Sequence, residues 1–79
     1  WYYLGKCYLG LNEYLDAAKS FRKSLKINPE YPASYFSLGI SYLKLNKLKK
    51  ANETLDFLYM LDHALFDSLN SEIKLTELK

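Results

Sequence analysis

One stretch of sequence occurs twice and decides the fold. Residues 1–17 read WYYLGKCYLGLNEYLDA, and residues 35–51 read YFSLGISYLKLNKLKKA. With a shift of 34 residues the two stretches are identical at these pairs: Leu4 and Leu38, Gly5 and Gly39, Tyr8 and Tyr42, Leu9 and Leu43, Leu11 and Leu45, Asn12 and Asn46, and Ala17 and Ala51. Self-similarity at a fixed period of this size indicates a repeat architecture.

The apolar residues of each copy fall at helical spacing. Steps of three and four separate Trp1, Leu4, Tyr8 and Leu11, and likewise Tyr35, Leu38, Tyr42 and Leu45. This period predicts one helix at the start of each copy. A second periodic run, which predicts a second helix, begins after Asn12 or Asn46, because asparagine tolerates the left-handed backbone of a tight turn. Pro29 and Pro32 end the first copy, since proline cannot continue a helix.

These residues resemble the tetratricopeptide repeat family, whose unit carries Trp-x-x-Leu-Gly-x-x-Tyr, then Ala-x-x-x-Phe, then Pro. The first copy matches at Trp1, Leu4, Gly5, Tyr8, Ala17, Phe21 and Pro29, and the second at Tyr35, Leu38, Gly39, Tyr42, Ala51 and Leu55. His63 stands where the closing proline of the second copy would fall. The resemblance implies an all-α fold, an α-solenoid of two helix hairpins followed by a C-terminal capping helix. In it, Gly5 with Ala17, and Gly39 with Ala51, would keep the two helices of each hairpin close together.

A single domain over residues 1–79 is predicted, in three parts. The first repeat, which begins inside the first helix of the family pattern, spans residues 1–31, and the second spans residues 32–63. Residues 64–79 leave the 34-residue register but place Phe66, Leu69, Ile73 and Thr76 at helical steps, which predicts one more helix. We expect this helix to cover the apolar end of the array and the opposite face, around Trp1, to be open.

Composition and charge narrow the class of protein. Of the 79 residues, 49% are hydrophobic and 25% are charged, which predicts a folded chain. Basic residues outnumber acidic ones by nine to three over residues 1–50, whereas acidic residues outnumber basic ones by six to two over residues 51–79. The excess of acidic residues over residues 51–79 argues against a nucleic-acid partner. Membrane insertion is not expected either, since the apolar stretches are shorter than the roughly 20 residues a bilayer requires.

No catalytic, metal or cofactor site is predicted. The chain has one cysteine, Cys7, and one histidine, His63, which cannot supply a disulfide within the chain, the ligand spacing of a metal site or a credible nucleophile and base. We expect Cys7 to be a small buried residue, as free cysteines usually are, and His63 to lie in a turn or at a helix cap. The sequence therefore predicts a protein that is not an enzyme and uses no cofactor.

Charges of opposite sign occupy equivalent positions in the second helices of the two copies. The pairs are Glu13 and Lys47, Asp16 and Lys50, Lys19 and Glu53, and Arg22 and Asp56. Because equivalent helices of neighbouring repeats run side by side, we expect these pairs to form a ladder between the two second helices. Exposed ion pairs are individually weak, so the ladder would specify register more than it adds stability.

The resemblance also implies a ligand-binding face. Six residues match the side of the first helices that lines the concave groove in tetratricopeptide proteins, where peptides bind: Tyr2, Tyr3, Lys6, Phe36, Ser37 and Ile40. Binding of a peptide and burial under neighbouring repeats both remain open for these residues. One subclass of the family holds a chaperone's C-terminal carboxylate with Lys and Asn residues. Tyr2, Lys6 and Ser37 do not match that clamp, so an apolar or helical segment is the expected ligand.

Two functions are predicted as alternatives. The first is a non-catalytic protein–protein interaction module, which binds a peptide or helical segment of a partner protein in the groove of its first helices. The alternative is a structural element of a larger tetratricopeptide protein that stacks through its open N-terminal face. There the basic N-terminal part of the chain would meet an acidic C-terminal part. A homodimer or larger homo-oligomer is expected in the second case.

Overall fold

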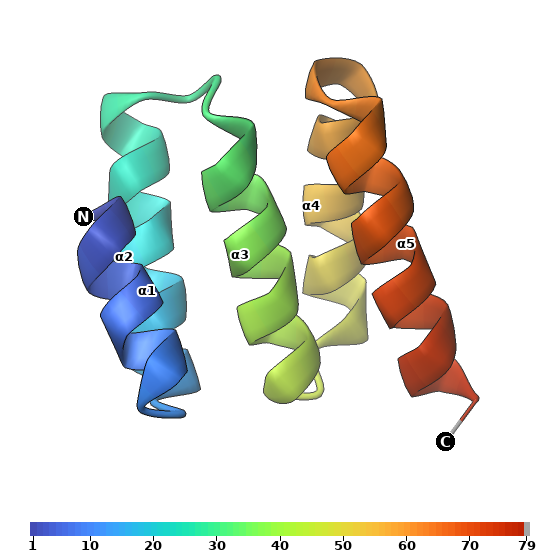
Figure 1. Ribbon diagram of the computed structural model, residues 1–79, viewed down its shortest axis with the longest axis horizontal. Coiled ribbons are helices and arrows are strands. Elements are labelled where there is room, and N and C mark those ends of the chain that lie inside the picture. The colour runs from blue at the N-terminus through green and yellow to red at the C-terminus, as the bar shows by residue number, and fades with distance from the viewer. Residues whose placement is uncertain (79) are drawn as a thin grey trace.

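Helices make up 83% of the structure, and no strand occurs among the residues described. The computed structural model describes residues 1–78. Its helices are α1 (Tyr2–Gly10), α2 (Tyr14–Ile27), α3 (Pro32–Lys44), α4 (Leu48–Leu61) and α5 (His63–Glu77). Helices α1 and α2 form one hairpin, α3 and α4 form the second, and α5 packs against both α3 and α4 (Figure 1). The predicted solenoid of two helix hairpins and a following helix is confirmed.

The turns inside the two hairpins have the same backbone conformation. Asn12 and Asn46 have φ angles of 60° and 59°, the left-handed region that asparagine enters more readily than most residues. In each turn the next amide then donates to a tyrosine carbonyl at 2.8 Å, Glu13 to Tyr8 and Lys47 to Tyr42. The prediction of a tight turn at each asparagine is therefore confirmed.

The connections after α2 and after α4 are set by proline and by a capping aspartate. Pro32 is the first residue of α3, where its missing N–H removes no helical hydrogen bond. The buried Tyr35 donates its hydroxyl to the Pro29 carbonyl at 2.9 Å, and burial raises the pKa of this phenol above its ordinary value. At the start of α5 the Asp62 carboxylate accepts from the Leu65 amide at 3.1 Å, so Asp62 caps the helix. His63 is the first residue of α5 rather than the turn or cap residue that was expected.

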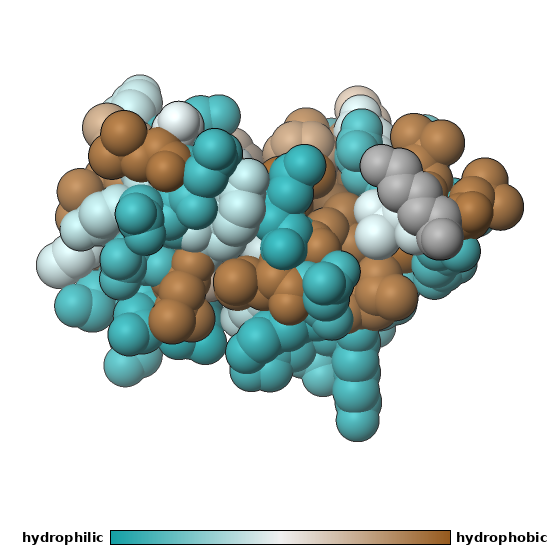
Figure 2. All heavy atoms as spheres, turned by 90° about the horizontal axis from the view of Figure 1, so that it is seen from below, coloured by the Kyte–Doolittle hydropathy of each residue, from teal (hydrophilic) through white to brown (hydrophobic). Residues whose placement is uncertain are grey.

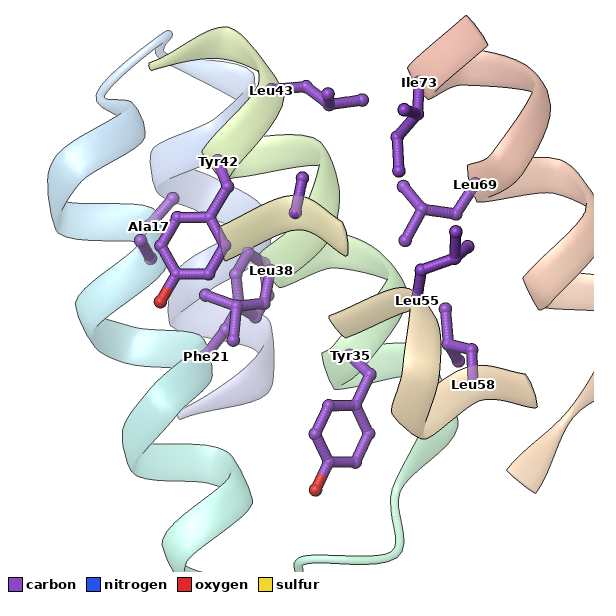
Figure 3. Close-up of a cluster of buried hydrophobic side chains, with 12 residues drawn as sticks. Ala17, Phe21, Tyr35, Leu38, Tyr42, Leu43, Leu55, Leu58, Leu69 and Ile73 are labelled. Carbon is purple, nitrogen blue, oxygen red and sulfur yellow. The ribbon is translucent and has the colours of Figure 1, made fainter. Parts of the chain in front are cut away.

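The core lies on both sides of α3, which contacts each of the other four helices. On one side Phe21 of α2 packs with Leu38 of α3, and on the other Leu69 of α5 points toward Leu55 of α4 (Figure 3). All four side chains are buried. Removal of apolar surface from water is the main favourable term in folding, so α3 is the helix around which the structure is held together.

Gly5 and Gly39 are positions of close approach, but not chiefly to the alanines expected. A Cβ at Gly5 would lie 2.6 Å from a ring carbon of Phe21. One at Gly39 would lie 2.7 Å from Oγ1 of Thr54 on α4 and 2.6 Å from a methyl group of Leu69 on α5. The glycines therefore make room for Phe21 in the first hairpin, and for Thr54 together with the fifth helix in the second.

Burial differs between equivalent residues of the two hairpins. Leu4 is 42% exposed, whereas Leu38 is 5% exposed. Cys7 is exposed although the equivalent Ser41 is fully buried, so the prediction that Cys7 is a buried residue is wrong. The first hairpin packs against α3, but no described helix packs on the corresponding side of α1. Position in the array, not residue type, decides burial here.

The second helices of the two hairpins do not contact each other, because α3 lies between them. The predicted ladder of ion pairs between α2 and α4 within the chain is therefore wrong. Its members are all exposed: Glu13, Asp16, Lys19, Arg22, Lys47, Lys50, Glu53 and Asp56. These charges lie on the outer faces of α2 and α4, where solvent replaces the expected partners.

Candidate functional site

The structure places the six predicted groove residues on two neighbouring helices. Tyr2, Tyr3 and Lys6 lie on α1, and Phe36, Ser37 and Ile40 lie on α3, which contacts α1. We call these six residues the A-helix surface. Tyr3 and Lys6 are exposed, Tyr2, Phe36 and Ile40 are half-buried, and Ser37 is only 3% exposed.

Ser37 belongs to a buried row of serines. Ser34, Ser37 and Ser41 follow at steps of three and four, so they lie along one side of α3, and all three are buried. The Ser34 and Ser24 hydroxyls share a hydrogen bond of 2.9 Å, and this bond places the row against the first hairpin. Ser37 therefore contributes packing to the A-helix surface and offers a ligand almost no area.

An aromatic pocket lies at one end of the A-helix surface, where α1 begins and α2 ends. It has a volume of about 260 Å³ and is lined by Trp1, Tyr2, Tyr3, Ser24, Ile27, Asn28 and Tyr31. The centre of the Tyr2 ring lies 5.3 Å from the centre of the Tyr3 ring and 5.2 Å from the centre of the Tyr31 ring. Both pairs of rings are arranged edge to face. Such geometry is the favoured one for aromatic pairs, so the walls of the pocket hold each other in place.

Sequence reasoning found part of this pocket. Tyr2 and Tyr3 are among the six groove residues that the family resemblance implies, whereas Ile27 and Tyr31 are not among them. Tyr31 stands between Pro29 and Pro32, and an aromatic residue between two prolines in a turn was the signal available for it. The hydrogen bond from Tyr35 to Pro29 fixes the turn that carries Tyr31.

The pocket and its rim differ in charge. No charged side chain lines the pocket. At the rim, however, Lys23 Nζ lies 4.4 Å from the centre of the Trp1 ring, a cation–π contact. Lys6 is exposed farther along α1. The interior therefore suits an apolar side chain, and the rim suits an acidic neighbour of that side chain.

The two residues considered as a nucleophile and its base lie on helices that are not neighbours. Cys7 lies on α1 and His63 on α5, two helices that do not contact each other. Within residues 1–78, no group of three or more His, Cys, Asp or Glu side chains is placed to hold a metal ion. Over the same residues, no helix has both the length and the apolar character needed to cross a membrane. What the site offers chemically is an apolar surface that ends in an aromatic pocket.

Two family models match this chain. One model of the tetratricopeptide repeat matches residues 1–31, and a second matches residues 20–51. No curated protein and no solved structure gives a match. Tetratricopeptide repeats are generally protein–protein interaction modules and are typically non-catalytic. The two matches, the helix hairpins and the 34-residue period together show that the chain belongs to the tetratricopeptide repeat family.

Proposed function

We propose that the A-helix surface binds an apolar or helical peptide segment of a partner protein, and that the aromatic pocket receives one side chain of that segment. The observation that carries this proposal is the overlap between the two features, since Tyr2 and Tyr3 belong to both. A volume of about 260 Å³ lies just below the range of about 300–1,000 Å³ typical of small-molecule sites. It suits a single side chain better than a cofactor.

The chemistry of the surface specifies the kind of segment. Half-buried Phe36 and Ile40 on α3 extend the apolar area away from the pocket. Aromatic walls bury a large area at little cost in side-chain entropy, which makes them frequent sites of strong binding. With Lys6 and Lys23 exposed beside the apolar area, the preferred segment has an apolar anchor residue flanked by acidic ones.

The test is selection of peptides from a random displayed library, followed by affinity measurements on an enriched peptide. Tyr3→Ala and Tyr31→Ala are each expected to weaken binding by about tenfold or more, as loss of a central aromatic contact does. Tyr59→Ala is the matched control, because Tyr59 is an exposed tyrosine on α4, outside the A-helix surface. Equal affinities of all three variants and the parent chain would place the binding site elsewhere.

A second pair of substitutions tests the far end of the surface. Replacing Phe36 and Ile40 together with serine should abolish binding of the same peptide. Because both side chains are half-buried, the helical signal of the double variant is measured by circular dichroism beforehand. A folded double variant that binds as tightly as the parent chain would restrict the site to the pocket.

Assembly through α1 is the second candidate function. Trp1 is 53% exposed and lines a hollow of about 170 Å³ together with Leu4, Tyr8 and residues of α2. On α3 the corresponding side is covered by the first hairpin, so a hairpin of the same kind would cover α1 in the same way. Leu4→Glu should then abolish the association that sedimentation velocity detects at about 0.5 M salt, where contacts between exposed charges are screened. Association that persists in this variant at high salt would count against the α1 face.

A further inference from the structure

The outer faces of α2 and α4 carry opposite charge at equivalent positions. On α2, a hollow of about 350 Å³ is lined by Lys19, Arg22, Lys23 and Lys26. On α4, the positions equivalent to Lys19 and Arg22 hold Glu53 and Asp56, and these carboxylates are exposed too. Figure 2 shows hydrophilic side chains gathered along the lower side of the view, where α2 and α4 lie.

The complementarity extends from the residues just before the two helices as far as Arg22 and Asp56. Four equivalent pairs have opposite charges: Glu13 and Lys47, Asp16 and Lys50, Lys19 and Glu53, and Arg22 and Asp56. The positions equivalent to the remaining lysines hold apolar residues: Lys23 is equivalent to Phe57, Lys26 to Met60 and Lys49 to Leu15. No equivalent pair on these helices has like charges. The match therefore involves four successive pairs rather than a single one.

A second copy of the chain has the geometry to use this match, which α3 prevents within one copy. Helices α2 and α4 run in the same direction (Figure 1), and as second helices of equivalent hairpins they hold equivalent residues at matching heights. A rotation of 180° about an axis that runs parallel to the two helices, equally far from both but outside the face they form, brings α2 of one copy against α4 of the other. The same rotation lays α4 on α2, so each pair is formed twice.

We propose that two copies of this chain associate through the face formed by α2 and α4 as a dimer with two-fold symmetry. A second copy is the partner because the chain itself supplies an acidic stripe with the spacing and register of its basic stripe. A two-fold contact uses the same patch on both copies and closes, so a dimer forms rather than a filament. The exposed Leu15, Phe57 and Met60 add apolar area to the face.

This dimer is independent of peptide binding and of assembly through α1. The A-helix surface lies on α1 and α3, and the proposed dimer face lies on α2 and α4. Because exposed ion pairs are weak and screened by salt, the dimer is expected to dissociate on dilution. It should also shift toward monomer between about 50 mM and about 0.5 M salt, where the screening length falls severalfold.

Charge reversal tests the proposed face by sedimentation velocity at rising concentration. The variant with Lys19→Glu and Arg22→Glu should lose the concentration-dependent rise in sedimentation coefficient, because like charges then face each other across the dimer. The variant with Glu53→Lys and Asp56→Lys should lose it for the same reason. An equimolar mixture of the two variants should regain it, since both contacts of the mixed dimer again join opposite charges.

Two control variants carry the same changes in net charge outside the face. One has Lys44→Glu and Lys74→Glu, and the other has Asp67→Lys and Glu72→Lys; all four residues are exposed on α3 or α5. Each control should associate at low salt as the parent chain does. A parent chain that stays monomeric at low salt at all concentrations would overturn the proposal. So would either reversed variant that alone associates like the parent chain.

Discussion

Gly5→Ala is expected to destabilise the chain, although alanine is the better helix former. In a helix interior the change by itself favours folding by about 1 kcal/mol. The new Cβ would, however, lie 2.6, 2.8 and 2.9 Å from three ring carbons of Phe21, where ordinary contact begins at 3.4 Å. Phe21 is fully buried, so its ring has no open space into which it could retreat by most of an ångström.

The magnitude follows from these two opposing effects. Overpacking a core costs about 1–3 kcal/mol, and a rigid ring that must move this far belongs in the upper part of that range. After subtraction of the gain in helix propensity, the free energy of unfolding falls by about 1–2 kcal/mol. In a domain of this size that corresponds to a melting temperature lower by about 5–15 °C. Thermal unfolding followed by far-UV circular dichroism measures the shift.

Gly10→Ala is the matched control, on the same helix and with the same chemical change. No atom lies within 4 Å of a Cβ at Gly10, so only the propensity gain remains and the melting temperature should rise by a few degrees. Phe21→Leu should reduce the cost of Gly5→Ala, since leucine stands at the equivalent position 55 of the second hairpin. A Gly5→Ala variant that melts at or above the parent chain would refute the packing of α1 on Phe21.

Three further experiments test other features of the structure. Ser24→Ala or Ser34→Ala alone leaves a buried hydroxyl without its partner and should lower the free energy of unfolding, measured in urea, by about 1–3 kcal/mol. The double variant should lose clearly less than the sum of the two single losses. Simple additivity of the two losses would contradict a shared hydrogen bond. Asp62→Ala removes the acceptor of the Leu65 amide and should cost about 0.5–2 kcal/mol in the same assay, and an unchanged stability would mean that this cap does not form. Cys7 should react with a thiol reagent in the native chain about as fast as in urea, and strong protection in the native chain would show that it is buried.

The sequence by itself determined the elements and their order. Helical spacing of apolar residues, the two turn asparagines and Pro32 depend on neighbours a few positions away in the chain, and helix and turn conformations are set largely over that distance. Five helices with turns at Asn12 and Asn46 could therefore be predicted. Tyr2 and Tyr3 could be assigned to the candidate site through the resemblance to tetratricopeptide repeats, because their motif positions fall on the helix face that lines the groove in that family.

Only the tertiary structure decided which of these faces are covered. Cys7 and Ser41 are equivalent in the repeat, yet one is exposed and the other buried, because the first hairpin packs against α3 whereas no described helix packs on the matching side of α1. The charges of α2 and α4 complement each other in sequence but are held apart by α3. Tyr31 reaches the aromatic pocket from a turn that the repeat pattern does not describe. Burial and contact depend on what packs beside a residue, and residues distant in the chain supply those neighbours.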